Sequence, residues 1–436
     1  MTRYCVIGAG AAGLSALHEL RAAGHVPVGY ERTRRVGGHW HTDYDALHLI
    51  TSRDMTSFDG FPMPGHYPHF PSRDQVRDYI EGYADVRGLR PFIRFGTEVT
   101  SVSPVPTGGR PGSAGWRVRT STGSDEVFDG VLVANGHLWQ AKVPAVPGRF
   151  GGVQLHSSQY RNVGDLAGSR VLVVGAGNSG CDLAVDVAQH RLAADIVVPE
   201  GVNFQPKSYF GVPRQQVEFL QQFTPDEQDL LNRLLAKVVL GEPASYGLPA
   251  PRSRTLSGGP TTVNSLLMYW IQHGRVGVRP GIERFDGSTV HFVDGSAADY
   301  DTVLWATGFN VAVPFLADDL LPWSAGCPLR RAGGILPEGV EQLYFIGLIA
   351  PRGPQIPVYG AQAKLVTRMI ALHARGAGAA VGERFETLHP PEDRVDIVRD
   401  VWLRQMADTE RVLDTFEPAG PGRSDQPSET DVSKIN

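Results

Sequence analysis

Two copies of one short glycine pattern constrain the fold of this chain more than any other feature. The pattern G-x-G-x-x-G follows an apolar run at Gly8, Gly10 and Gly13, and again at Gly175, Gly177 and Gly180. An apolar strand that ends in these glycines and leads into a helix is typical of the turn that binds a dinucleotide pyrophosphate. One copy is weak support, but two copies predict an α/β fold with two Rossmann-like dinucleotide-binding domains.

The residues after the first copy are those of a complete nucleotide-binding unit. We expect a helix over 11–23, which stops at Gly24, and a strand over 26–30 that leads to Glu31. A carboxylate about 20 residues beyond the glycines accepts hydrogen bonds from ribose hydroxyls, while the pyrophosphate lies at the helix N-terminus. Glu31 is therefore the predicted ribose-binding residue of the first site.

A longer internal repeat supports the duplication. Residues 129–136 and 301–308 each run from a predicted hairpin through an apolar strand to A-N-G or A-T-G. We expect each segment to close one nucleotide-binding unit. The residues of these closures expected at the cofactors are Ala134, Asn135, Gly136, Thr307 and Gly308.

A third pattern lies just before the second glycine copy. The spacing F-x-G-x-x-x-H-x-x-x-Y is filled by Phe150, Gly152, His156 and Tyr160. In residue type, spacing and position it resembles the fingerprint of the flavin-containing monooxygenases, the class B single-component flavoprotein monooxygenases. Related Baeyer–Villiger enzymes carry Trp where this chain has Tyr160, so the resemblance favours the flavin-containing monooxygenases.

The resemblance implies that the second dinucleotide-binding domain is inserted into the first. An FAD-binding domain would take residues 1–160 and 305–416, and an NAD(P)H-binding domain residues 161–304, with a helical insert near 214–274. Residues 417–436 are polar and rich in Pro and Gly, and we expect them to be disordered.

The insert contains the strongest helix signal in the chain. Thr224, Pro225 and Glu227 form a predicted capping box with proline at the first helical position, and Gly241 ends the helix. Its apolar stripe is expected to run through Leu230, Leu231, Leu234, Leu235 and Val238. We interpret this segment as a packing helix of the insert in preference to a substrate lid.

For the reaction, the resemblance implies an FAD-dependent monooxygenase that consumes NADPH or NADH. One oxygen atom of O2 would pass, through a flavin C4a-(hydro)peroxide, to an amine nitrogen or a sulfide sulfur of a small molecule. Alternatives are Baeyer–Villiger oxygenation of a ketone, an NAD(P)H-dependent flavin reductase or oxidase, and a non-enzymatic FAD-binding protein. A disulfide reductase would need a cysteine pair near the flavin, and the sequence has none.

The resemblance also assigns residues to the cofactors. The turn from Gly37 to Trp40 resembles the one that lies against the flavin, and Gln362 would approach the isoalloxazine ring. Expected at FAD are Gly8, Gly10, Ala12, Gly13, Glu31, Arg32, Gly38, Trp40, Val99, Gly347 and Gln362. Expected at the linkers and the nicotinamide nucleotide are His156, Tyr160, Gly175, Gly177, Asn178, Ser179, Gly180, Glu200, Lys207 and Phe309.

The oxygen side of the site departs from the family pattern. Relatives often place here an Asn that hydrogen-bonds the flavin–oxygen adduct, and in our register that position is Ile50. Ile50 has no donor, so Thr51, Ser52 or His48 would have to take its place.

The residues at the end of the strand that follows the second glycine pattern also depart from the family pattern. NADPH-preferring relatives usually carry an arginine there for the 2′-phosphate, whereas this chain has Pro199 and Glu200. A carboxylate repels a phosphate and accepts a hydrogen bond from a free 2′-hydroxyl. Lys207 and Arg214 lie downstream and could bind the phosphate instead, so NADPH and NADH both stay open.

Composition excludes other partners. The net charge of −5 gives no basic surface for nucleic acid. Cys5, Cys181 and Cys327 are far apart, which indicates a reducing, cytoplasmic compartment. No apolar run approaches the roughly 18 residues of a membrane span, and the first strand starts too near Met1 for a signal peptide.

We expect no metal site, because His39 and His41 have no third ligand. A homodimer is compatible with the sequence.

Overall fold

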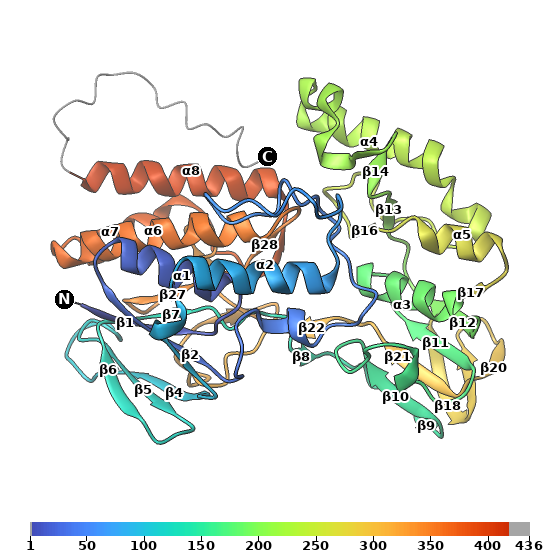
Figure 1. The fold of residues 1–436 in the computed structure, drawn as a ribbon, viewed down its shortest axis with the longest axis horizontal. Helices are drawn as coiled ribbons and strands as arrows, with labels where there is room; N and C mark the ends of the chain where they lie inside the picture. The colour runs from blue at the N-terminus through green and yellow to red at the C-terminus, as the bar shows by residue number, and fades with distance from the viewer. Residues whose placement is uncertain (1, 418–436) are drawn as a thin grey trace.

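The computed structural model describes residues 2–417, which form two lobes (Figure 1). The first lobe is built on a parallel sheet with the strand order β27-β7-β1-β2-β3. Its strands are β1 Arg3–Ile7, β2 Val26–Glu31, β3 Ile93–Phe95, β7 Gly130–Val133 and β27 Leu343–Phe345. The strands β1 and β7 are almost wholly buried and apolar, as expected for a parallel sheet covered on both faces.

The second lobe repeats this sheet. Its strand order is β10-β21-β11-β12-β17, again all parallel. These strands are β10 Val153–His156, β11 Arg170–Val174, β12 Ala193–Val197, β17 Val276–Arg279 and β21 Thr302–Trp305. The order of the four strands from β7 to β3 matches that from β21 to β17. The fifth position differs, because β27 follows its glycine turn along the chain whereas β10 precedes its own.

Helices cover both sheets. In the first lobe these are α1 Ala11–Ala22, α2 Arg73–Val86, α6 Ile356–Ala374, α7 Gly378–Leu388 and α8 Arg399–Phe416. In the second lobe α3 Asn178–Gln189 packs on its sheet through an apolar face. The capping box of α2, in which the Ser72 and Gln75 side chains satisfy each other's backbone N–H groups, fixes where that helix begins.

Each lobe also carries an antiparallel meander. The first consists of β4 Val99–Pro104, β5 Trp116–Thr120 and β6 Asp125–Phe128. The second consists of β18 Ile282–Gly287, β19 Thr289–Phe292 and β20 Ala297–Asp299, with β9 Gly148–Phe150 beside β18. Gly123, Gly287 and Gly295 lie in the turns of these meanders, and all three have positive φ.

The predicted domain boundary at residue 160 is wrong. Both β9 and β10 belong to the second lobe, where they pair with β18 and β21. The lobes divide instead at two short strands, β8 Gln140–Ala141 and β22 Phe309–Asn310, which pair antiparallel and form the crossing between lobes. A strand that comes before its own glycine turn gives no local signal of the sheet to which it will pair, and this is why the sequence misplaced it.

The fingerprint around β10 is a structural brace. Phe150 packs in the core beneath the meander of the second lobe, and a Cβ atom on Gly152 would lie 2.3 Å from the carbonyl oxygen of Asp301. The His156 Nε2 atom donates to the carbonyl oxygen of Gly308 at 2.9 Å. The fully buried Tyr160 hydroxyl donates to the Asp186 carboxylate on α3 at 2.5 Å. The pattern thus fastens β10 to its sheet, to a helix and to the linker.

The insert stands above the second lobe, at the upper right of Figure 1. Its elements are β13 Asn203–Gln205, α4 Pro225–Leu240, β16 Thr261–Val263 and α5 Leu266–Gln272. The cap of α4 at Thr224 and its end at Gly241 are confirmed. The predicted packing stripe is wrong in part, because Leu230, Leu234 and Val238 are 47%, 50% and 81% exposed.

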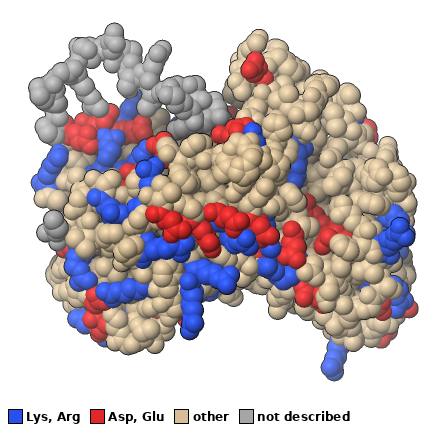
Figure 2. All heavy atoms as spheres, viewed as in Figure 1, with Lys and Arg blue, Asp and Glu red and all other residues tan. Residues whose placement is uncertain are grey.

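The other short strands are β14 Ser208–Tyr209, β15 Val212–Pro213, β23 Trp323–Ser324, β24 Cys327–Pro328, β25 Arg330–Arg331, β26 Leu336–Pro337, β28 Ala350–Pro351 and β29 Asp396–Ile397. Among residues 2–417, none of the helices combines the length and apolarity that crossing a membrane requires. Acidic and basic side chains lie side by side on the face shown in Figure 2. The predicted disorder of 417–436 concerns a segment that, apart from Glu417, lies outside the described residues.

The brace yields a stability prediction. Gly152→Ala places a methyl group against the Asp301 carbonyl, whereas Gly151→Ala meets its nearest neighbour at 3.4 Å, an ordinary contact. We expect Gly152→Ala to lower the free energy of unfolding by about 1–3 kcal/mol, the usual cost of overpacking. Thermal denaturation of both variants measures this. Equal midpoints for the two would show that the close approach at Gly152 does not constrain the fold.

Candidate functional site

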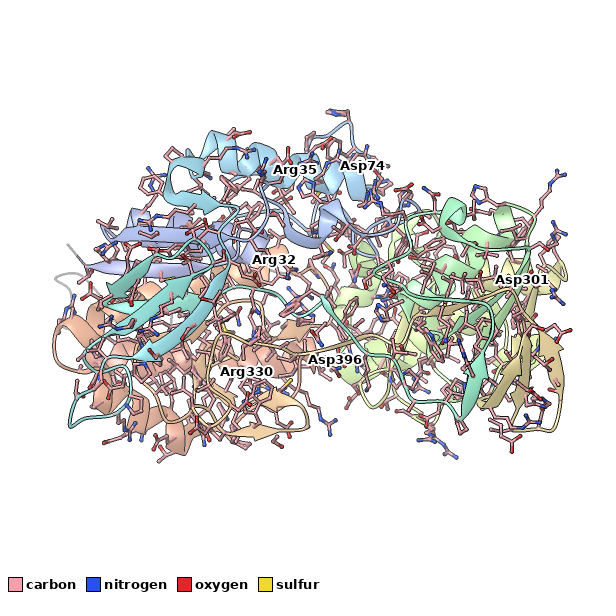
Figure 3. All side chains as sticks on the ribbon, turned by 90° about the horizontal axis from the view of Figure 1, so that it is seen from below. Arg32, Arg35, Asp74, Asp301, Arg330 and Asp396 are labelled. Atoms are coloured by element: carbon pink, nitrogen blue, oxygen red, sulfur yellow. The ribbon has the colours of Figure 1, made fainter. Side chains whose placement is uncertain are left out.

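A cavity of about 2110 Å³ lies between the two lobes and the insert. It runs from the first glycine turn, past the loop at Ile50, to Asn178 at the start of α3. Pockets for drug-sized ligands usually measure about 300–1,000 Å³, so this space has room for a dinucleotide and a further molecule. Figure 3 shows Arg32 and Asp396, both in its wall, near the middle of the molecule where the lobes face each other.

The first glycine turn has no side chains that could cover its backbone N–H groups. Gly8 has φ +102°, and a Cβ atom there would lie 2.5 Å from the carbonyl oxygen of Ala134. A Cβ atom on Gly13 would lie 1.9 Å from the carbonyl oxygen of Gly8. Only glycine fits either position, so the backbone N–H groups at the start of α1 stay open to the cavity, as pyrophosphate binding requires.

The second glycine turn has the same geometry. Gly175 has φ +110°, and its Cβ atom would lie 2.6 Å from the carbonyl oxygen of Ala306. A Cβ atom on Gly180 would lie 1.9 Å from the oxygen of Gly175, the same distance as in the first turn. Both turns therefore have the backbone shape of a dinucleotide cradle.

Glu31 lies where the sequence predicts it. Its two carboxylate oxygens accept the backbone N–H groups of Ala9 and Thr33, each at 2.8 Å. The side chain is buried but lines the cavity. Because each carboxylate oxygen has a second lone pair, Glu31 can hold the glycine turn and still accept hydrogen bonds from a ribose.

Most residues predicted at FAD line this cavity. Arg32 lies over the Trp139 ring at 5.2 Å, and Gly38 and Trp40 belong to a short helix, Gly38–His41. The predicted residues found in the wall are Gly8, Gly10, Ala12, Glu31, Arg32, Gly38, Trp40, Val99, Ala134, Asn135, Gly136 and Gly347. These residues could hold an FAD molecule at the first site.

Three predicted contact residues act indirectly. Gln362 is fully buried and does not line the cavity. Its amide accepts from the N–H of Gly347 at 2.9 Å and donates to the carbonyl of Gly333 at 2.9 Å. The prediction that Gln362 approaches the flavin ring is therefore wrong, and it shapes the wall through Gly347. His156 and Tyr160 likewise lie outside the wall, in the brace described above.

At the second site, only Asn178 of the glycine motif lines the cavity. Its Oδ1 atom accepts the N–H of Val263 at 2.8 Å, which holds β16 against the glycine turn. The other predicted residues, Gly175, Gly177, Ser179, Gly180, Thr307, Gly308 and Phe309, lie in the turn beneath and in the linker. The Thr307 hydroxyl donates to the carbonyl of Lys142, so it joins the two linkers.

Near the predicted ribose end of the nicotinamide cofactor lies Arg252, a residue that was not identified from the sequence. Glu200 forms an ion pair with Arg252 at 2.9 Å, and both side chains are exposed. Gly201 is bridged to Pro251, which brings the two segments together. No sequence pattern marks Arg252, because the whole helix α4 separates it from Glu200 along the chain.

Lys207 has a different role from the predicted one. Its ammonium group lies over the Phe70 ring at 5.6 Å and acts on the charge of the partly buried Asp182 carboxylate. Tyr44, from the first lobe, and Asn264 both donate to Asp182, at 3.0 and 2.9 Å. Burial raises the pKa of Asp182 to about 6, although Lys207 opposes the rise. Lys207 therefore belongs to a contact between lobes, and no ion pair joins it to Glu200 within residues 2–417.

On the oxygen side, Ile50 and Thr51 line the cavity, whereas Ser52 lies behind it. The hydroxyl of Thr56 donates to the carbonyl oxygen of Ser52 at 2.8 Å. Thr56 must then accept the hydroxyl hydrogen of Thr51, at 2.7 Å. Thr51 has no hydrogen left to donate into the cavity. Neither Thr51 nor Ser52 therefore replaces the missing Asn as a donor in this structure.

His137 is a wall residue that the sequence analysis did not single out. Its Nδ1 atom donates to the carbonyl of Gly347 at 3.3 Å. Burial lowers the pKa of His137 to about 4, so the ring is neutral at pH 7. It follows directly after the Ala134–Gly136 closure, and that position is the signal that could have identified it.

The cysteines take no part in the cavity. Cys5, Cys181 and Cys327 are all free and buried, and none lies in the wall. Burial raises the pKa of the Cys5 and Cys181 thiols, which keeps them protonated. The chain therefore has no cysteine pair for disulfide reduction.

Comparison with known proteins identifies the family of this chain. The family model described as flavin-binding monooxygenase-like matches residues 1–375. Flavin-containing monooxygenase 5 of Oryctolagus cuniculus is 34% identical over 395 residues, 84% of this chain and 72% of that protein. Indole-3-pyruvate monooxygenase YUCCA1 of Oryza sativa subsp. japonica is 31% identical over 353 residues, 78% of this chain and 82% of that protein.

Solved structures show the same fold. Oxidized steroid monooxygenase bound to NADP superposes with a TM-score of 0.71 at 20% identity, over 95% of this chain and 98% of that one. The predicted architecture of two dinucleotide-binding domains is shared with such neighbours. The chain belongs to the flavin-binding monooxygenase-like family, and it is an FAD-dependent monooxygenase that takes its electrons from a nicotinamide dinucleotide.

Proposed function

We propose that this enzyme transfers one oxygen atom of O2 to a sulfide sulfur or an amine nitrogen of a small molecule. The observation that supports this is the continuity of the cavity. One space reaches from the first glycine turn, past the Ile50 loop, to Asn178 at the second glycine turn. A nicotinamide and a flavin can therefore meet in it beside a third, small molecule.

The residues of the chain bind and shield the cofactor, while the bound flavin supplies the electron transfer and the oxygen activation. The open N–H groups at the start of α1 would hold the pyrophosphate of FAD, and Glu31 would hold its ribose. His137 stays neutral beside the Gly347 turn, so it adds no charge to the wall. Leu49, Ile50 and Met55 make one side of the space apolar, which suits an uncharged sulfur or nitrogen centre.

Product analysis tests the proposal. Purified enzyme with FAD, NADPH and ¹⁸O2 is offered a thioether, a tertiary amine and a cyclic ketone. We expect sulfoxide or N-oxide that carries one ¹⁸O atom. A labelled lactone as the main product would assign Baeyer–Villiger activity instead, and NADPH oxidation that yields only hydrogen peroxide would assign an oxidase.

The first glycine turn generates a prediction on flavin binding. Gly13→Val forces a side chain into the oxygen of Gly8, 1.9 Å from the Cβ position. We expect the purified variant to lose most of its non-covalent FAD, measured as the ratio of flavin to protein absorbance. Gly82→Val on α2, where no atom lies within 4 Å of the Cβ position, is the control and should stay yellow. Full occupancy in Gly13→Val would remove this turn from the FAD site.

The Glu200–Arg252 pair generates a prediction on the nicotinamide cofactor. Glu200 repels a 2′-phosphate and Arg252 attracts it, so we expect kcat/KM for NADPH and NADH to differ by less than about tenfold, roughly 1.4 kcal/mol. Glu200→Ala should shift the ratio toward NADPH, and Arg252→Ala should shift it toward NADH. The control is Arg284→Ala, which removes an exposed pair with Asp286 elsewhere in the lobe. Unchanged ratios in both variants would place the ribose end of the cofactor elsewhere.

The oxygen side generates a prediction on coupling. Ile50 has no hydrogen-bond donor, and the Thr51 hydroxyl already donates its hydrogen to Thr56. A flavin–oxygen adduct would therefore receive no hydrogen bond from these two residues, so we expect the enzyme to release hydrogen peroxide when NADPH is consumed without substrate. Ile50→Asn adds a donor and should lower the peroxide formed per NADPH, whereas Ile50→Leu should not. A peroxidase-coupled assay measures the ratio. A tightly coupled parent enzyme, unaffected by Ile50→Asn, would contradict our register for this loop.

A further inference from the structure

The insert forms one wall of the cavity, and this wall is more polar than the apolar side near Ile50. It is made by the short helix Arg214–Gln216, the helix Glu218–Gln222 and the first half of α4. The outer face of the insert seen in Figure 2 carries few charged side chains. Among the charged residues on the cavity side are Arg214, Asp226, Asp229 and Arg233. The charged side chains of this wall can therefore act on a molecule that enters the cavity.

Most ionic groups around this wall have a partner. Asp229 pairs with Arg233 at 2.9 Å and also accepts the N–H of Leu256. On the opposite side, Arg352 pairs with Asp396 at 2.9 Å. Within each pair the two charges cancel, so these residues offer no net charge to a ligand.

Arg214 differs from them. Its side chain keeps some exposure because it faces the cavity, yet its Nε atom has no contact with solvent and no hydrogen-bond partner. The nearby group that acts on its charge is the Tyr209 hydroxyl, and neither Asp226 nor Asp229 does so. Within residues 2–417 no ion pair forms at Arg214. Burial lowers the pKa of this guanidinium, but arginine stays charged in proteins, so the wall holds an uncompensated cation.

A buried cation without a partner costs stability unless a ligand provides the opposite charge. The planar fork of a guanidinium matches a carboxylate or a phosphate. The nicotinamide nucleotide already has the glycine turn at α3 for its pyrophosphate and the Glu200–Arg252 pair at its predicted ribose end. From the position of Arg214 on the insert wall, we propose that it binds the carboxylate of the substrate, so that the enzyme oxygenates thioethers or amines that carry a carboxylate. This inference rests on the proposed function and specifies its substrate class.

Binding to the oxidised holoenzyme tests this without turnover. Isothermal titration calorimetry compares 3-(methylthio)propanoate with its uncharged methyl ester. We expect the acid to bind at least about tenfold more tightly than the ester, the range of a hydrogen bond between charged groups. Equal affinities in the parent enzyme would overturn the proposal. Because no oxygen transfer is needed, this outcome is independent of whether the proposed reaction is correct.

Variants assign the effect to one residue. Arg214→Gln should remove the preference for the acid and leave ester binding within about twofold, and Arg214→Lys should restore part of the preference. Lys237→Gln, which removes an exposed cation of α4 paired with Glu242, is the matched control and should keep the preference. Loss of NADPH affinity in Arg214→Gln, with the preference for the acid retained, would assign Arg214 to the cofactor phosphate and overturn the proposal.

Discussion

Each lobe depends on one close contact between a carbonyl oxygen and a glycine turn. The oxygens of Ala134 and Ala306 lie 2.5 and 2.6 Å from where a Cβ atom would stand on Gly8 and Gly175. Protein interiors are packed too densely to absorb a methyl group at that distance. The contact brings the closing strand, the turn and the first helix to one edge of the sheet, which is where nucleotides bind in such folds.

The two edges reach one cavity because the connections between the lobes are held together. The β8–β22 pair, the bond from Thr307 to Lys142 and the bond from His156 to Gly308 all act on the same short crossing. A misplaced crossing would separate the flavin site from the nicotinamide site, and catalysis is sensitive to small errors of placement. The fingerprint that identifies the family is thus a mechanical element of the fold, and it does not line the cavity.

Two features of the site were beyond the reach of sequence patterns because they depend on what each polar hydrogen or charge meets in space. Thr51 and Ser52 had the right chemistry for a donor, but the bond to Thr56 uses the hydrogen of Thr51, and Ser52 lies behind the wall. Lys207 and Arg214 looked equivalent in the sequence. The structure brings Lys207 near enough to Asp182 to act on its carboxylate, whereas no carboxylate within residues 2–417 acts on the charge of Arg214.

The duplicated α/β fold, the two glycine turns, the position of Glu31 and the cap of α4 could be predicted from the sequence, because each follows from backbone geometry or from residues near one another in the chain. Long-range packing places β10 in the second sheet, brings Arg252 to Glu200, and puts Gln362 behind Gly347. These outcomes depend on pairing between distant segments. Local propensity and spacing carry no information about which distant strand, charge or carbonyl group will become a neighbour.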